Sequence, residues 1–352
     1  MTIYKIARKL SAAAVLAMVG VTAFAGNPDR RGQNGATELL LNPWARSSGI
    51  NSLNTASIRG LESERINVAG LAFVTGTDMC FSRTNYLSGT GININSFGLA
   101  TKLGGEESSK GVLGLTIMNF DFGNIEITNE NFPDGGIGTY RPQFMNIGIS
   151  YAKVFSNRIY GGVTFRLINQ SVPDASASGF ALDAGIQYQT GERDRTKFGI
   201  SLRNIGTPMA YSGDALAYRA LVANGKFDQT LYQRSASFEL PSLMNIGGSY
   251  DIITNDMQKL TMVANFTSNS FTADNYGAGL EYSWKNMVMV RAGYRHADEN
   301  EVHTGLAGGL SLNLPFAKDD DGNVTRTFAI DYSYRPSNPF QGTHALGILL
   351  KL

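Results

Sequence analysis

Charged side chains that recur at every second position are the first feature of this sequence that could do chemistry. They fall on the polar faces of alternating segments and are Arg166, Asp183, Arg203, Glu281, Arg291, Arg295, Asp331 and Arg335. Such groups can line a path for a solute, hold a plug, or pair with one another across strands. Because buried charges persist mainly when they are paired, we favour the pairing interpretation and leave the path open as the alternative.

Two short stretches contain residue types that bind metals. Residues 296–303, HADENEVH, place two histidines among carboxylates, a combination that can bind zinc, but their spacing matches no zinc pattern. Residues 318–323, KDDDGN, resemble part of a calcium loop but lack the EF-hand spacing and its terminal Glu. We interpret the first as a solvated loop and the second as a turn, and we expect no metal and no cofactor.

Catalytic constellations are missing from the sequence. No Gly-x-Ser-x-Gly elbow stands between a strand and a helix, and the only histidines are His296, His303 and His344. We therefore expect a protein that is not an enzyme. The formal net charge of +1 also gives no reason to expect a nucleic-acid partner.

The first 25 residues predict export. Lys5, Arg8 and Lys9 precede a short apolar stretch at 10–21, and an A-x-A cleavage site follows at 23–25. This is the pattern of a secretory signal peptide, with the mature chain starting near Gly26. Cys80 is the only cysteine, so the exported protein has no internal disulfide.

Alternation with a period of two dominates the chain from residue 79 onward. Phe328, Ile330 and Tyr332, for example, are separated by Ala329 and Asp331. Segments with this pattern are 79–86, 92–103, 111–121, 145–154, 158–169, 178–190, 196–205, 242–252, 259–269, 275–285, 287–296, 304–314, 326–335 and 343–352. Their lengths suit tilted membrane strands.

Alternation alone does not separate a soluble sandwich from a barrel in lipid. Three features favour the barrel: aromatic residues near strand ends, an even number of segments, and connections that alternate between short turns and longer loops such as 122–144 and 206–241. We predict an all-β protein, a transmembrane antiparallel β-barrel of about 14 strands over residues 67–352 in the outer membrane. Residues 26–66 show no strand alternation and are expected to form a plug or a periplasmic lead segment.

The central part of the chain resembles a known family. Residues 171–191, SVPDASASGFALDAGIQYQTG, and 197–214, KFGISLRNIGTPMAYSGD, resemble the PorV/PorQ family of outer-membrane proteins, as do NPWARSSG at 42–49 and GLESERINVAGLA at 60–72. The wider resemblance is to FadL-like fourteen-stranded barrels, whose N-terminal segment occupies the lumen and often carries Asn-Pro-Ala. Here Asn67 and Ala69 flank Val68 in place of that proline.

The resemblance implies a function without catalysis. PorV/PorQ proteins work with the type IX secretion system of the Bacteroidota, where they associate with the translocon barrel, the cargo's C-terminal signal domains or the attachment complex. The first hypothesis is therefore an accessory protein, a monomeric barrel within a hetero-complex in contact with outer-membrane lipid. The alternative is a FadL-like transporter or pore for hydrophobic small molecules. A soluble secreted β-protein that binds sugar is the third hypothesis.

Overall fold

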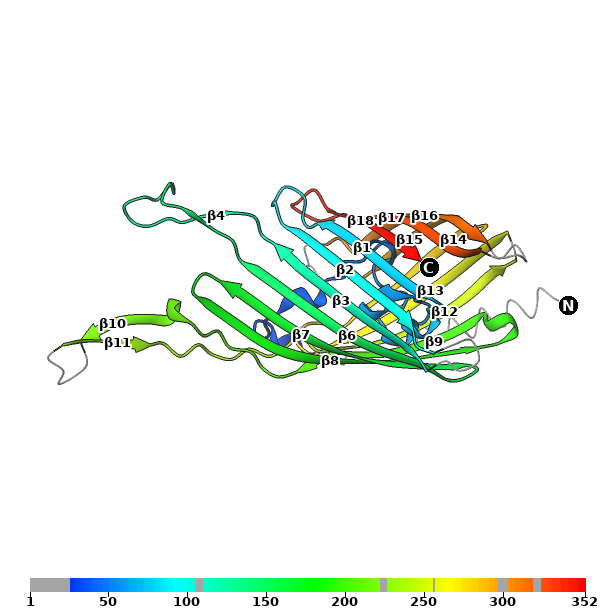
Figure 1. Cartoon of the computed structure of the whole chain (residues 1–352), viewed down its shortest axis with the longest axis horizontal. Helices are drawn as coiled ribbons and strands as arrows, with labels where there is room; N and C mark the ends of the chain where they lie inside the picture. Colours follow the sequence, from blue (N-terminus) through cyan, green and yellow to red (C-terminus); the bar gives the residue numbers. More distant parts are fainter. Residues whose placement is uncertain (1–25, 105–109, 222–226, 256, 297–302, 319–323) are drawn as a thin grey trace.

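The computed structural model describes residues 26–352 except 105–109, 222–226, 256, 297–302 and 319–323, so the predicted signal peptide lies outside the described residues. The described chain forms a closed barrel of fourteen antiparallel strands (Figure 1). Its strands are β1 (Thr77–Asn85), β2 (Asn93–Lys102), β3 (Val112–Asp121), β6 (Gln143–Ser156), β7 (Ile159–Val172), β8 (Ala175–Thr190), β9 (Thr196–Gly206), β12 (Leu243–Thr254), β13 (Gln258–Asn269), β14 (Asn275–Trp284), β15 (Val288–Arg295), β16 (Leu306–Lys318), β17 (Val324–Arg335) and β18 (Thr343–Lys351). The predicted fold class is confirmed.

Successive strands of the barrel are neighbours, and the last strand closes the sheet. β18 pairs antiparallel with β1, with Ile348 opposite Phe81, so no strand is left with an open edge. Closure of this kind explains how a sheet of this size is held together with Cys80 as a buried free thiol. The predicted segments match these strands in number and order.

The connections between strands are longer at one end of the barrel than at the other. The end that carries the C-terminus has mostly short connections, such as that between β6 and β7, and is called the turn end here. The opposite end, the loop end, carries two hairpins within its long connections: β4 (Ile125–Glu126) with β5 (Thr139–Tyr140), and β10 (Ala217–Leu221) with β11 (Asp228–Tyr232). Figure 1 shows these hairpins extending beyond the barrel. The alternation of loop lengths predicted from the sequence is confirmed, and the hairpins add strands where only loops were expected.

The outer face of the barrel is apolar and its inner face is polar. Along β9, Phe198 and Ile200 are about half exposed, whereas Lys197 and Ser201, which flank them and point to the opposite face, are buried. A soluble sheet would show the reverse order, and an exposed apolar surface of this extent is typical of a wall that faces lipid. None of the described helices is long and apolar enough to span a membrane.

Residues 26–76 precede the barrel strands and are called the plug here: 36–76 lie inside the barrel and are mostly buried, whereas 26–35 are mostly exposed and contact loop-end connections at Glu239 and Phe271. The plug is built from short helical turns: η2 (Pro28–Arg30), η3 (Thr37–Leu40), α2 (Ala45–Ser48), η4 (Leu61–Arg65) and η5 (Val68–Phe73). Figure 1 shows it in blue behind the front strands. Residues 67–76 continue the plug, and the first barrel strand begins at Thr77. Two further turns, η6 (Glu192–Asp194) and η7 (Asp214–Leu216), lie in connections between strands.

Candidate functional site: the lumen and its plug

Inward glycines make room for the plug along most of the barrel wall. A Cβ atom added to any of them would lie within 3.4 Å of a plug atom. They are Gly98, Gly114, Gly148, Gly162, Gly185, Gly199, Gly247, Gly277, Gly279, Gly293, Gly309 and Gly347. Because a side chain at these positions would occupy space that plug atoms fill, the wall and the plug are shaped to fit each other.

One close contact with the plug backbone involves a pair of glycines that face each other on adjacent strands. Gly199 of β9 is opposite Gly247 of β12, and both approach the plug at Thr55. A Cβ at Gly199 would lie 2.5 Å from the Thr55 carbonyl oxygen, which is backbone and cannot rotate away. The adjacent Gly248 faces outward, with nothing within 4 Å of a Cβ there. Only the inward glycines are thus required by the plug.

The wall formed by β6 to β9 holds a charged cluster that we call the buried network, defined by Glu64, Arg166, Asp183 and Arg203. Arg166 Nη2 lies 2.5 Å from Glu64 Oε1 of the plug and 2.8 Å from Asp183 Oδ2. Arg203 donates to the Leu39 carbonyl of the plug at 3.2 Å. The side chains of Glu64, Arg166 and Asp183 are at most 3% exposed, so these charges compensate each other away from water.

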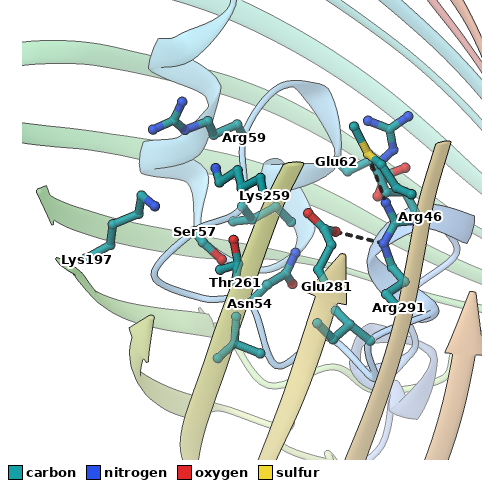
Figure 2. A pocket seen from close by; sticks show the side chains of 14 residues that line it. Arg46, Asn54, Ser57, Arg59, Glu62, Lys197, Lys259, Thr261, Glu281 and Arg291 are labelled. Atoms are coloured by element: carbon teal, nitrogen blue, oxygen red, sulfur yellow. Dashed lines mark hydrogen bonds and ion pairs between the residues drawn. The ribbon is translucent and has the colours of Figure 1, made fainter. Parts of the chain in front are cut away.

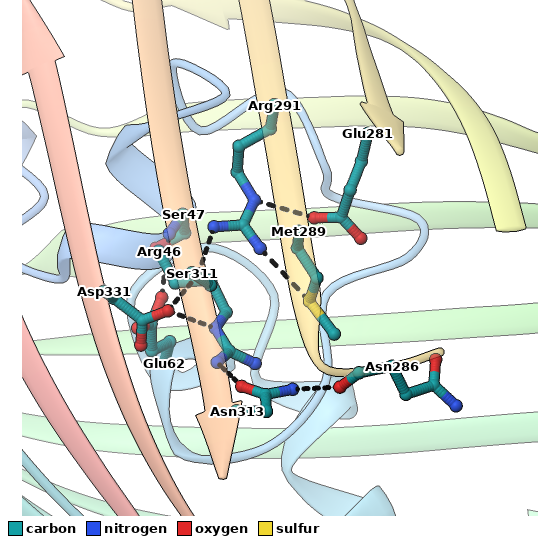
Figure 3. Close-up of polar contacts among 10 residues, drawn as sticks. All are labelled: Arg46, Ser47, Glu62, Glu281, Asn286, Met289, Arg291, Ser311, Asn313 and Asp331. Atoms are coloured by element: carbon teal, nitrogen blue, oxygen red, sulfur yellow. Dashed lines mark hydrogen bonds and ion pairs between the residues drawn. The ribbon is translucent and has the colours of Figure 1, made fainter. Parts of the chain in front are cut away.

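The opposite wall, β14 to β17, holds a second cluster, the cavity network, defined by Arg46, Glu281, Arg291, Ser311 and Asp331 (Figure 3). Arg291 bonds Glu281 at 2.8 Å and Ser311 at 2.6 Å. Ser311 in turn donates to Asp331, which also accepts from Arg46 of the plug at 2.9 Å. The cluster therefore joins four strands to the plug through one continuous chain of hydrogen bonds.

A cavity of about 160 Å³ lies between the plug and the inner faces of β9 and β13 to β15, next to this second cluster (Figure 2). Its lining includes Arg59, Lys197, Lys259, Glu281 and Arg291. Lys259 and Glu281 remain 38% and 33% exposed although they point into the barrel, so the cavity is open to water. Lys197, Lys259 and Arg59 belong to the part of the lumen nearest the turn end, where β9 and β13 begin.

The third charged group lies at the loop end. His303, which precedes β16, packs with its ring centroid 6.0 Å from that of Tyr86. Burial, together with the nearby guanidinium groups of Arg335 and Arg295, lowers the pKa of His303 to about 4. His303 is therefore neutral at pH 7, beside two permanent positive charges.

The loop end of the lumen is lined by apolar side chains that we call the apolar mouth. Ile94, Met118 and Phe120 are buried there, and Leu41, Tyr86, Ile92, Phe122 and Phe144 pack against them. Phe122 meets Phe144 edge to face, with ring centroids 4.9 Å apart. One inward position deeper on β2, β3 and β6 the residues are polar: Ser96, Thr116 and Asn146. A layer of polar side chains thus lies directly below the apolar mouth on these three strands.

All eight charged residues singled out from the sequence lie on inward faces, in three separate places. Arg166, Asp183 and Arg203 belong to the buried network, and Glu281, Arg291 and Asp331 to the cavity network. Arg295 and Arg335 lie near His303 at the loop end. Sequence reasoning missed the plug residues Glu64 and Arg46, which complete the two networks, because the plug has no periodic pattern that assigns faces.

The two stretches considered for metals fall largely outside the described residues, which leave out 297–302 and 319–323. Of the flanking histidines, His296 stacks on Tyr276 with ring centroids 5.1 Å apart. Within the described part of the chain, no three His, Cys, Asp or Glu side chains are grouped to hold a metal ion.

No protein-family model and no curated protein matches the chain in sequence. Solved structures similar to it include the toluene transporter TodX of Pseudomonas putida, with a TM-score of 0.55 at 11% identity over 88% of this chain and 97% of TodX. The deltaS2S3 mutant of TodX gives 0.51 at 11% identity over 88% and 98% of the two chains. A Pseudomonas aeruginosa FadL homologue gives 0.48 at 11% over 88% and 96%. The chain therefore shares the barrel fold of TodX, and the fourteen-stranded barrel expected from the sequence is confirmed.

Proposed function

We propose that this protein is a non-enzymatic outer-membrane barrel that admits a small hydrophobic molecule at its loop end. The observation that carries the proposal is the apolar mouth, an inward-facing aromatic and aliphatic lining at the loop end of the lumen. The fold shared with TodX, described as a toluene transporter, also supports a role in admitting a hydrophobic molecule. The apolar outer face and the predicted signal peptide support placement in the outer membrane.

The mouth suits an apolar ligand because its aromatic side chains are held apart from the polar interior. Phe144 and Phe122 are only partly buried, so they present apolar surface toward the loop end. Covering that surface with an apolar molecule is favourable by about 25 cal/mol per Å². Below the mouth the plug contacts inward positions of most barrel strands, so we expect onward passage to require part of the plug to move.

Uptake of radiolabelled toluene into vesicles whose outer leaflet is lipopolysaccharide tests the proposal. We expect reconstituted protein to raise the initial uptake rate over protein-free vesicles. Phe144→Ser should abolish most of that increase, because it places a hydroxyl in the apolar lining. The matched control is Phe155→Ser, which changes the same residue type on the same strand, on the outer face near the turn end. Equal uptake by both variants, or no increase from the wild-type protein, would reject the proposal.

A second candidate function is that of an accessory protein of the type IX secretion system, as the family resemblance implies. It is favoured by the β10–β11 hairpin, which extends beyond the barrel. The hairpin and its connection expose large apolar side chains, with Tyr218, Leu221, Phe227 and Tyr232 between 51% and 79% exposed. Exposed apolar groups of this kind at a loop end are typical of a protein-binding surface.

Purification of tagged protein from its native outer membrane in mild detergent tests this second function. Recovery of a very large translocon barrel, or of proteins that share a C-terminal secretion domain, would support it. Replacing residues 217–232 by a short Gly-Ser linker should remove those partners, whereas shortening the β4–β5 hairpin serves as the control. Recovery of the barrel alone would count against it.

A further inference from the structure

The cavity beside the plug contains more positive than negative charge, and the excess is concentrated on one side. Figure 2 shows Arg59, Lys197 and Lys259 on one side, with the Arg291–Glu281 pair and Arg46 on the other. On the second side each guanidinium has a carboxylate partner, Glu281 for Arg291 and Asp331 for Arg46. The positive charges of Arg59, Lys197 and Lys259 on the first side are only partly neutralised by carboxylates.

Lys197 and Lys259 share a single carboxylate oxygen. Asp251 Oδ2 lies 2.6 Å from Lys197 Nζ and 3.5 Å from Lys259 Nζ, and Asp251 Oδ1 accepts from Thr261 at 2.7 Å. One carboxylate neutralises one ammonium group, so the second ammonium charge is left over. Lys259 has the longer contact and the more exposed side chain, so the excess charge lies on the cavity side of this pair.

Arg59 supplies a second excess charge. It stacks on Phe73 at 4.3 Å from the ring centroid and donates to Gln189 at 3.2 Å, and neither partner is charged. Among the described residues no carboxylate lies within 4.0 Å of its guanidinium. The stacking fixes the plane of the guanidinium and leaves its remaining donors available. The cavity wall between Arg59 and Lys259 therefore presents donors and positive charge to water.

Neutral polar groups continue this surface. Asn54, Ser57 and Thr261 also line the cavity. The Asn54 Oδ1 atom is buried and has no hydrogen-bond partner among the described residues. A buried amide oxygen without a partner is destabilising unless a bound molecule donates a hydrogen bond to it. Asn54 Oδ1 only accepts, so the occupant must carry a hydroxyl beside its charged oxygens, as hydrogen phosphate and citrate do; this requirement is independent of the charge excess.

From these observations we propose that the cavity is a binding site for a small multivalent oxyanion, held mainly by Arg59 and Lys259. Glu62 also lines the cavity but lies beside Arg46, on the other side, so the side formed by Arg59 and Lys259 keeps an excess of two positive charges. This excess suits a multiply charged anion, and about 160 Å³ admits a phosphate or a small polycarboxylate without a long alkyl chain. Water reaches the site from the turn end, so the ligand comes from the compartment that this end faces. The site is separate from the apolar mouth and does not depend on the function proposed for it.

Calorimetric titration of the full-length protein in non-ionic detergent tests the site, with inorganic phosphate and citrate as separate probes and chloride as the reference. We expect saturable binding of one multivalent probe per barrel, and the stronger of the two probes distinguishes a phosphate from a polycarboxylate ligand. The double variant Arg59→Gln/Lys259→Gln should weaken binding at least tenfold. The control Arg158→Gln/Lys285→Gln removes two positive charges from turn-end connections outside the cavity and should change affinity less than twofold.

A variant with higher affinity shows that the loss of binding in the double variant is not caused by misfolding. Glu281→Gln removes the carboxylate that neutralises Arg291 at the edge of the cavity and should raise the affinity severalfold. A damaged barrel would not bind more tightly. The proposal is overturned if the wild-type protein binds neither probe, if both double variants lose affinity equally, or if Glu281→Gln leaves affinity unchanged.

Discussion

The two charged walls of the lumen use similar residues in different surroundings. In the buried network, Arg166 lies between Glu64 and Asp183, and all three side chains are nearly inaccessible to water. In the cavity network, Arg291 is equally buried, but its partner Glu281 is one-third exposed at the border of a water-filled space. One wall is packed shut against the plug and the other leaves a cavity.

The difference indicates that a lumen charge has two separate uses in this barrel. Where water is excluded, each charge depends on its partner, because an unpaired buried ion is strongly unfavourable. Where water enters, a charge can lose its partner and be hydrated, so it remains available for a ligand. The same Arg–carboxylate pair is therefore structural on one wall and open to function on the other.

Removing the central cation of the buried network should produce the largest effect. Arg166→Met leaves Glu64 and Asp183 buried without a cation, which should cost about 3–5 kcal/mol of unfolding free energy or prevent folding. Denaturant unfolding of protein reconstituted in lipid vesicles, followed by gel mobility, measures this. The control Arg141→Gln breaks an exposed 3.8 Å pair with Asp121 and should change stability by less than about 0.5 kcal/mol. A loss for Arg166→Met no larger than for the control would contradict the structural role.

Adding a side chain at Gly199, where the barrel wall touches the plug at Thr55, should have the next largest effect on stability. Gly199→Ala places a methyl group 2.5 Å from the Thr55 carbonyl, and overpacking of this kind costs about 1–3 kcal/mol. We expect the plug to shift and ion conductance in planar bilayers to rise. Gly248→Ala, where a Cβ meets open space, should conduct as little as the wild-type protein. Equal conductance of the two variants would mean that the plug does not seal the lumen.

Replacing the arginine of the cavity network by methionine should lower the unfolding free energy by less than Arg166→Met does. Arg291→Met leaves Glu281 without its partner, but water in the cavity can hydrate that carboxylate, so we expect a loss of about 1–2 kcal/mol. The unfolding assay used for Arg166→Met gives the comparison directly. A loss as large as that of Arg166→Met would show that hydration through the cavity does not protect this network.

The alternation of the strands was sufficient to predict the barrel wall and the inward position of every charged residue chosen. A period of two fixes the face of Asp183 or Arg291 once the strand is assigned. The plug was not predictable in the same way, because its short 3₁₀ turns carry no period, so Glu64 and Arg46 could not be matched to Arg166 and Asp331.

One signal of a filled lumen was nevertheless present in the sequence. Glycine recurs at inward positions of successive strands, as at Gly185, Gly199 and Gly247, where a hollow barrel would tolerate side chains. The hairpin β10–β11 was missed for a different reason. Its five-residue strands are shorter than the segments that periodicity can identify, and they pair with each other outside the barrel.

The charged group at the loop end, His303 with Arg295 and Arg335, should show the smallest effect, and it tests whether burial or hydration controls a lumen charge. His303 stands beside Arg295 and Arg335, and its pKa is lowered to about 4 from an ordinary value of 6.5. Between these two values the unfolded chain binds more protons than the folded one, so folded stability falls as the pH falls from 6.5 toward 4. Relative to His303→Gln, which does not titrate, the wild-type protein should lose about 0.7 kcal/mol between pH 7 and pH 6. Denaturant unfolding of both proteins at the two pH values measures the difference. A pH-independent difference would mean that folding does not lower the pKa of His303 and that its ring is hydrated like Glu281 at the cavity.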